Sequence, residues 1–116
     1  MTDRDTDTSK AHVLERLYAV IESRHGDDPS ESYTAKLLDA GPEQISKKLG
    51  EEAVEAVIEG VRGDRKALAA ESADVLYHLL VLWSARGVAP DDVWAALEKR
   101  MGTSGIAEKK ARKRLA

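Results

Sequence analysis

The residues that most suggest chemistry in this 116-residue chain are carboxylates at helical spacing. Glu52 and Glu55 lie three residues apart, and Glu71 and Asp74 repeat that spacing further along. Residues three apart share one face of an α-helix. Carboxylates that face one another repel unless a cation lies between them. The pattern therefore predicts a site for a hard divalent cation, which prefers oxygen ligands.

A turn between the two acidic pairs places them at similar depth in a helical hairpin. Gly63 and Asp64 predict this turn. Glu55 lies nine residues before Asp64 and Glu71 lies seven residues after it, so antiparallel packing brings the pairs together. Mg²⁺ keeps several waters and accepts phosphate oxygens as further ligands. Such a hairpin is suited to hydrolysing a phosphoanhydride.

A solvated charged surface is the competing interpretation of the first acidic pair. Glu51 and Glu59 accompany Glu52 and Glu55, and a helix with this many acids is usually a charged surface. The second pair is harder to explain in this way. It opens an apolar stretch, in which an unpaired acid is costly to bury.

Apolar periodicity and helix breakers predict the elements that position these acids. Ser32 and Asp64 are suitable N-caps, and Pro42 and Pro90 suit the first position of a helix. The loops are short, which favours antiparallel neighbours. The sequence therefore predicts an all-α bundle of four to five helices, which span about residues 10–24, 33–40, 42–61, 65–85 and 90–102.

Composition indicates one globular domain with two different ends. Hydrophobic residues make up 42% of the chain and aromatic residues only 4%, so Leu, Val, Ile and Ala must form the core, as is typical of packed helices. The absence of Cys excludes disulfides, thiolate metal sites and cysteine catalysis. We expect a disordered leader at residues 1–9, a helical domain at 10–102 and a basic C-terminal tail at 103–116.

Charge and hydropathy exclude two classes of partner. The net charge of −3 argues against a nucleic-acid-binding protein, which usually carries a basic excess. The longest apolar run, Val75–Trp83, is interrupted by His78 and is much shorter than the roughly 20 residues that span a bilayer. No targeting segment is recognisable. These features predict a cytoplasmic protein with no membrane partner.

The same apolar run, VLYHLLVLW, predicts an interface. It is apolar nearly all round the helix and must be covered on every side. A four-helix monomer of this size offers too little cover. We therefore expect an oligomer, in which part of this helix lies between subunits. The alternative is the central helix of a compact monomer.

The acidic motifs and their surroundings resemble those of a known enzyme family. The stretches KKLGEEAVEAVIEG and ESADVLYHLLVLW are similar to the phosphoribosyl-ATP pyrophosphohydrolases of histidine biosynthesis, which belong to the all-α, MazG-type nucleotide pyrophosphohydrolases. Further similarity lies in SYTAKLLDAG, in the YH pair after ExxD, and in SGIAEKKAR. The superfamily signature EExxE…ExxD reads here Glu51, Glu52, Glu55, Glu71 and Asp74.

The resemblance implies a reaction, a cofactor and an assembly. The reaction is hydrolysis of phosphoribosyl-ATP to phosphoribosyl-AMP and pyrophosphate, the second step of histidine biosynthesis, by Mg²⁺-assisted attack of water. The assembly is a homodimer. The implied Mg²⁺ ligands are Glu52, Glu55, Glu71 and Asp74. Glu51, which points about 100° away from its neighbour, either orients water or a metal ligand at the catalytic site or is solvated.

Lysines that precede the acids by one turn are candidates for binding phosphate. An ammonium group suits this role, and we favour Lys48 over Lys47. The alternative is helix pairing, of Lys47 with Glu51 and of Lys48 with Glu52, although that order is the weaker orientation.

The other candidates for substrate contacts lie in the segments that resemble the family. Tyr33 and Thr34 are placed to line the nucleotide pocket, while the alternative for Tyr33 is packing. Arg100, Ser104 and Lys109 are placed to close over the phosphoribosyl phosphate, while the alternative is a frayed basic tail. The basic tail is also suited to contacting another histidine-pathway enzyme.

Several residues and functions have a structural or non-catalytic alternative. His78 is best interpreted as a satisfied core histidine. Trp83 and Trp94 are assigned to packing. Two rival functions stay open: a house-cleaning nucleoside triphosphate pyrophosphohydrolase of the same superfamily, and a non-enzymatic helical interaction module.

Overall fold

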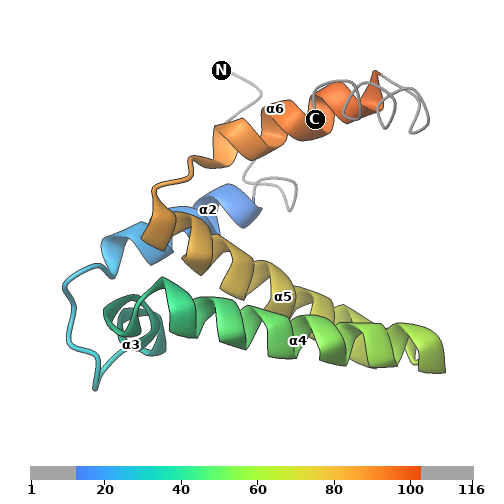
Figure 1. Ribbon diagram of the computed structural model, residues 1–116, viewed down its shortest axis with the longest axis horizontal. Coiled ribbons are helices and arrows are strands. Elements are labelled where there is room, and N and C mark those ends of the chain that lie inside the picture. The colour runs from blue at the N-terminus through green and yellow to red at the C-terminus, as the bar shows by residue number, and fades with distance from the viewer. Residues whose placement is uncertain (1–12, 103–116) are drawn as a thin grey trace, which may run out of the picture.

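The protein is all-helical throughout the part that its computed structural model describes, residues 13–102 (Figure 1). These residues form no strand, which confirms the predicted fold class. The expected leader at 1–9 and the expected tail at 103–116 lie outside the described residues. The helices are α2 (Val13–Ser23), α3 (Tyr33–Ala40), α4 (Pro42–Arg62), α5 (Arg65–Arg86) and α6 (Pro90–Met101).

Local capping explains where the helices begin and end. The Ser32 hydroxyl accepts a hydrogen bond from the Ala35 amide at 3.1 Å, and the Asp64 carboxylate accepts one from the Ala67 amide at 3.0 Å. Both predicted N-caps are therefore confirmed. Gly63 ends α4 with a φ of 76°, a left-handed conformation that other residues adopt at a cost.

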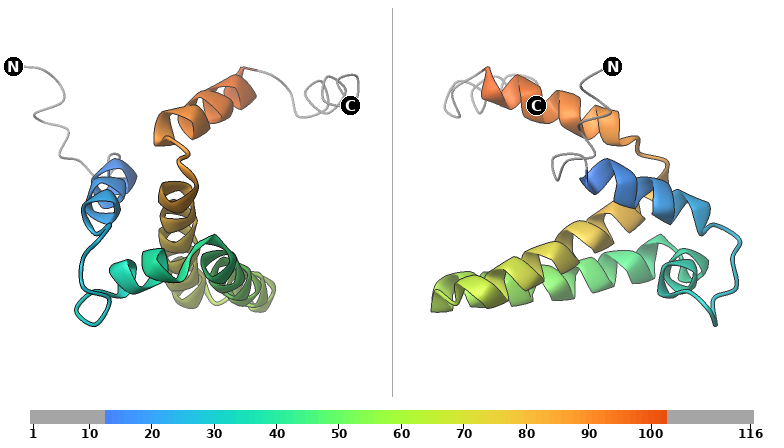
Figure 2. Two further views of the ribbon diagram at one scale, coloured as in Figure 1. Left: turned by 60° about the vertical axis from the view of Figure 1, so that its left-hand side comes forward. Right: turned by 180° about the vertical axis from the view of Figure 1, so that it is seen from behind.

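Helices α4 and α5 form a long antiparallel hairpin, as the Gly63–Asp64 turn predicts (Figures 1 and 2). Helix α2 packs on α5, while the short helix α3 contacts both arms of the hairpin. Helix α6 leaves the end of α5 and diverges from the hairpin (Figure 1). The hairpin is thus braced at one end only, by α2 and α3.

The hydrophobic core lies at that braced end. Its buried members are Ile21, Leu37, Ile45, Leu80 and Val81, which come from α2, α3, α4 and α5. The indole rings of two partly buried tryptophans, one on α5 and one on α6, meet edge to face at 5.9 Å, which supports their assignment to packing.

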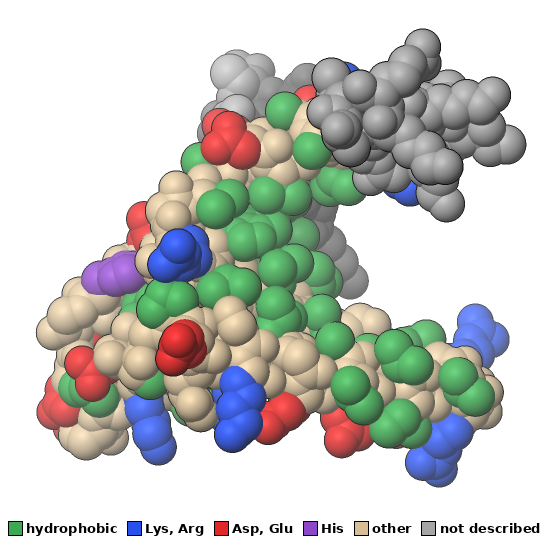
Figure 3. All heavy atoms as spheres, in the orientation of Figure 1, with side chains coloured by type: hydrophobic (Ala, Val, Ile, Leu, Met, Phe, Trp, Pro, Cys, Tyr) green, Lys and Arg blue, Asp and Glu red, His purple; other side chains and the backbone are tan. Residues whose placement is uncertain are grey.

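The unbraced end of the hairpin carries apolar side chains that are exposed in the described structure. Val54, Val57 and Val61 of α4 are exposed, and Val61 keeps 85% of its surface accessible. Leu76 in the apolar half of α5 is 40% exposed. Hydrophobic side chains also line the concave face between α6 and the hairpin (Figure 3). None of the described helices is both long enough and apolar enough to cross a bilayer.

Candidate metal centre

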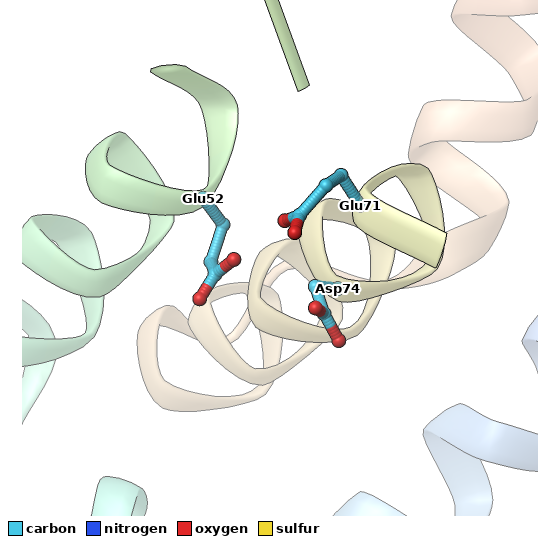
Figure 4. Close-up of side chains that lie close together, drawn as sticks. All are labelled: Glu52, Glu71 and Asp74. Carbon is cyan, nitrogen blue, oxygen red and sulfur yellow. The ribbon is translucent and has the colours of Figure 1, made fainter. Parts of the chain in front are cut away.

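Three carboxylates from the two arms of the hairpin converge on one space. Glu52 extends from α4 and Glu71 from the facing helix α5, where Asp74 lies one turn further along (Figure 4). Each residue offers a carboxylate oxygen, and these oxygens all lie within 4.8 Å of one another. The hairpin thus brings together both halves of the predicted acidic motif.

The carboxylates of this cluster face one another across the hairpin, and burial together with the neighbouring acids raises the pKa of Glu71. The Oε2 atom of Glu71 is inaccessible to water and has no hydrogen-bond partner among residues 13–102. Burial raises the pKa of the Glu71 carboxyl, and the neighbouring Glu52 carboxyl raises it further, followed by the charges of Asp74 and Glu55. Acceptors that face one another without a donor fit a hard divalent cation with oxygen ligands.

Glu55 and Glu51 occupy different positions around the cluster. Glu55 is exposed on α4 and lies outside the group of three converging carboxylates, although its charge contributes to the raised pKa of Glu71. The Glu51 carboxylate lies 3.8 Å from the ammonium group of Lys48, and the Glu51 side chain is 54% exposed. This ion pair favours the solvated alternative for Glu51. Lys47 is exposed on the same helix.

A polar and aromatic group adjoins the acids, one turn further along α5. The Thr34 hydroxyl on α3 lies 2.6 Å from the Tyr77 hydroxyl, and the Tyr33 hydroxyl lies 3.4 Å from Nε2 of His78. Nδ1 of His78 lies 2.8 Å from the backbone carbonyl oxygen of Asp74. The structure therefore brings the two predicted α3 residues close to the acidic helix turn. His78 is 5% exposed and both ring nitrogens are engaged, as expected of a satisfied core histidine.

Comparison with known proteins shows the family of this chain. A family model described as phosphoribosyl-ATP pyrophosphohydrolase matches residues 14–101. The chain belongs to this family. A protein of Azospirillum brasilense named phosphoribosyl-ATP pyrophosphatase is 60% identical over 92% of this chain and 96% of its own length. Proteins with the same name from Gluconobacter oxydans and Cereibacter sphaeroides are 56% and 64% identical, over 92% and 86% of this chain and 80% and 97% of their own lengths. The resemblance inferred from the motifs is thereby confirmed.

Other residues expected to contact substrate are not gathered around the acids. Arg100 lies in the last turn of α6, which diverges from the hairpin (Figure 1). Ser104 and Lys109 lie outside the described residues. Within one described chain, the phosphoribosyl-ATP pyrophosphohydrolase fold thus brings together the acids and the α3 residues but leaves α6 apart.

A second polar cluster, at the other end of α5, is missing from the sequence-based candidates. The buried Ser84 hydroxyl donates a hydrogen bond to the Glu22 carboxylate, and Nε2 of His25 lies 2.6 Å from the same hydroxyl. Glu22 and His25 lie three residues apart, a spacing that could have indicated their pairing. Both Glu22 and Ser84 approach the same nitrogen of His25, so the three residues do not form a hydrolytic triad, in which serine and carboxylate contact opposite nitrogens.

Proposed function

We propose that this protein hydrolyses phosphoribosyl-ATP to phosphoribosyl-AMP and pyrophosphate, the second step of histidine biosynthesis. The observation that supports this most directly is the cluster of Glu52, Glu71 and Asp74, which lies within the segment matched by the family. The names of the relatives give the substrate and the reaction type. A merely charged interaction surface would not require acids to converge across a hairpin.

The cofactor in this proposal is Mg²⁺, held by Glu52, Glu71 and Asp74, with Glu55 as a further ligand. Facing carboxylates supply the hard oxygen donors that this ion prefers, and the partnerless oxygen of Glu71 fits such a role. When bound, the ion neutralises phosphate charge and lowers the pKa of water. The carboxylates would hold the ion that orients the triphosphate. Water attacks the α or β phosphorus, the P–O bond of the α–β bridge breaks, and a carboxylate takes the proton of the attacking water, which gives phosphoribosyl-AMP and pyrophosphate. Because no side chain acts as nucleophile, we expect no covalent intermediate.

The remaining substrate contacts surround these acids in our proposal. Tyr33 and Thr34 line the nucleotide pocket, and the 50% exposure of Tyr33 leaves one part of its ring available to a base. Lys47 and Lys48 bind phosphate oxygens in this proposal. Glu51, although exposed and paired with Lys48, orients water from the edge of the site. The residues proposed to close over the phosphoribosyl phosphate are Arg100, Ser104 and Lys109.

We also propose that the protein is a homodimer. The exposed valines Val54, Val57 and Val61 form a continuous apolar stripe on α4, and Leu76 adds to the exposed apolar surface on α5. Contiguous apolar surface of this kind is typical of an interface. We propose a cytoplasmic location, which suits a biosynthetic enzyme. We also propose that the basic tail at 103–116 contacts another histidine-pathway enzyme.

Pyrophosphate release from phosphoribosyl-ATP in the presence of Mg²⁺ tests the function. We expect release by the wild-type protein and its loss in Asp74→Asn, which keeps the side-chain volume and removes the charge. Glu22→Gln is the matched control, because Glu22 belongs to the other polar cluster. Release from ATP, dATP or dCTP but not from phosphoribosyl-ATP would indicate a house-cleaning enzyme. A folded protein that is inactive on every substrate would favour an interaction module.

A further inference from the structure

The hydrogen-bonding direction of His78 is determined by its partners. Nδ1 lies 2.8 Å from the Asp74 carbonyl oxygen, which can only accept a hydrogen bond, so Nδ1 carries the hydrogen. In the neutral ring, Nε2 is then an acceptor. The Tyr33 hydroxyl, at 3.4 Å, is placed to donate to it. The ring is 5% exposed, so water competes little for either nitrogen.

Only one of these two hydrogen bonds connects different helices, because His78 and Asp74 both lie on α5, four residues apart. Tyr33 is the first residue of α3, and Asp74 supplies an acid from α5. The Thr34–Tyr77 hydrogen bond of 2.6 Å lies beside the Tyr33–His78 bond, between the residue after Tyr33 and the residue before His78. The rings of Tyr33 and Tyr77 stack with centroids 6.3 Å apart, and Tyr77 meets His78 edge to face at 5.0 Å. The described polar contacts between α3 and α5 thus lie directly beyond the acidic turn.

We infer that His78 is a positioning residue for the metal centre: it fastens the Asp74 turn of α5 to α3. This inference rests on the proposed function, because it assumes that Asp74 binds the cation. Repulsion between Glu52 on α4 and the acids of α5 pushes the two arms of the hairpin apart. Helix α3 packs on both arms of the hairpin, so the hydrogen bond from Tyr33 on α3 to His78, one turn beyond Asp74 on α5, opposes that separation.

Two substitutions remove the hydrogen bond between His78 and Tyr33 and leave the one between His78 and the Asp74 carbonyl. The amide nitrogen of Asn reaches the position of Nδ1, so His78→Asn can keep the bond to the Asp74 carbonyl but loses the one to Tyr33. Tyr33→Phe removes the same link from the other side and keeps an aromatic ring at a half-exposed position. If His78 only fills space, Tyr33→Phe has no effect at the metal. If it positions Asp74, both variants weaken the site, and combining them adds little because they break one link.

Titration of the full-length protein with Mn²⁺, followed by the electron paramagnetic resonance signal of the free ion, tests this inference without substrate. We expect Tyr33→Phe and His78→Asn each to lower Mn²⁺ affinity about tenfold, the low end of the range for outer partners of metal ligands, and the double variant to lower it no further. His25→Asn is the matched control and should bind as the wild type does, because His25 lies in the other cluster.

Other results would contradict the inference in distinguishable ways. Wild-type affinity in Tyr33→Phe overturns the positioning role, as do losses that add fully in the double variant. If instead the wild type binds Mn²⁺ no better than Asp74→Asn does, the proposed metal site itself is wrong and the role of His78 is wrong with it. Because Tyr33→Phe changes only one hydroxyl on the first residue of α3, its result stands even if His78→Asn does not fold.

Discussion

The two polar clusters that involve α5 differ in whether their carboxylates have a hydrogen-bond donor. Near the end of the helix, the Glu22 carboxylate accepts a hydrogen bond from the buried Ser84 hydroxyl, and His25 lies 3.4 Å away. Near its beginning, Glu71 faces Glu52 across the hairpin, and its Oε2 atom has no partner. Among the described residues, the first cluster contains donors and an acceptor, whereas the second consists of acceptors.

We interpret this difference as one between a structural cluster and a proposed metal-binding cluster. A buried acceptor that finds a donor stabilises the fold and needs nothing else, so the Glu22 cluster simply joins α2 to α5. A buried acceptor without a donor destabilises the protein by leaving its desolvation uncompensated. Oε2 of Glu71 is such an acceptor, and its neighbours Glu52 and Asp74 are also acids, so we propose that this cluster holds a cation and is not a packing device. The α3 contacts beside the acids belong to the first type, since their hydroxyls and the His78 ring are paired.

The largest expected effect distinguishes the clusters by activity. Glu52→Gln should lower kcat/KM for phosphoribosyl-ATP about 1000-fold, because Lewis-acid stabilisation is worth several kcal/mol and each 1.36 kcal/mol is tenfold. Glu22→Gln should stay within about threefold of the wild type, because it touches no proposed ligand. Pyrophosphate release at several substrate concentrations measures both. Similar losses in the two variants would show that the acids of the hairpin have no special role.

The second effect distinguishes the clusters by metal-dependent stability. Mg²⁺ at about 100 times its dissociation constant should stabilise the wild type by about 2.7 kcal/mol, because it binds only the folded state. Thermal denaturation with Mg²⁺ and with EDTA measures this. Glu71→Gln should lose the Mg²⁺ effect, while Ser84→Ala should keep it. A Glu71→Gln protein that Mg²⁺ still stabilises to the wild-type extent would contradict the proposed ligand set.

The fold was largely predictable from the sequence because its signals are local. Ser32, Gly63 and Asp64 act within one turn of helix, and each ends or begins a helix where expected. The spacing of acids around the 63–64 turn likewise predicted that both arms contribute to one cluster. Here periodicity and hairpin symmetry suffice, because the partners lie on consecutive helices.

What the sequence did not reveal depends on non-consecutive helices. Ser84 meets Glu22 and His25 only because α2 packs on the end of α5, and nothing in an isolated serine signals a buried partner. The link from Tyr33 to His78 depends on how α3 lies across the hairpin. The ion pair of Lys48 with Glu51 lies within one helix, but it has a spacing of three residues instead of the expected four. Both spacings place two side chains on one helix face, so the side-chain rotamers determine which pair forms.

The third effect measures the structural cluster by itself. Ser84→Ala removes the hydroxyl that donates to Glu22 and leaves a buried position with no new polar group. We expect a loss of about 1.5 kcal/mol in the free energy of unfolding, because a hydrogen bond to a charged group contributes about this much. Urea denaturation measures it, with Ser46→Ala on the exposed face of α4 as the control. A loss no larger than in that control would mean that the cluster does not fasten α2 to α5.

The smallest effect concerns the pH dependence of the metal-free protein and follows from the raised pKa of Glu71. The folded state holds this proton more tightly than the unfolded state, in which the pKa is about 4.5. The stabilisation due to the protonated carboxyl is therefore complete below that value. It is lost as the pH rises through the higher pKa of the folded state, because an ionised Glu71 then faces Glu52 and Asp74 without a cation.

Urea denaturation in EDTA between about pH 4.5 and pH 7 measures this dependence, and Glu71→Gln isolates it from the other carboxyl groups, which titrate in both proteins. The stability of the wild type should fall relative to Glu71→Gln as the pH rises. Because the variant carries no charge at position 71, we expect Glu71→Gln to be the more stable protein at neutral pH in EDTA. Mg²⁺ should reverse that order, since it stabilises only the protein that retains the carboxylate. A wild type that gains stability relative to Glu71→Gln with rising pH in EDTA would mean that Glu71 is satisfied as Glu22 is, and the contrast between the clusters would fail.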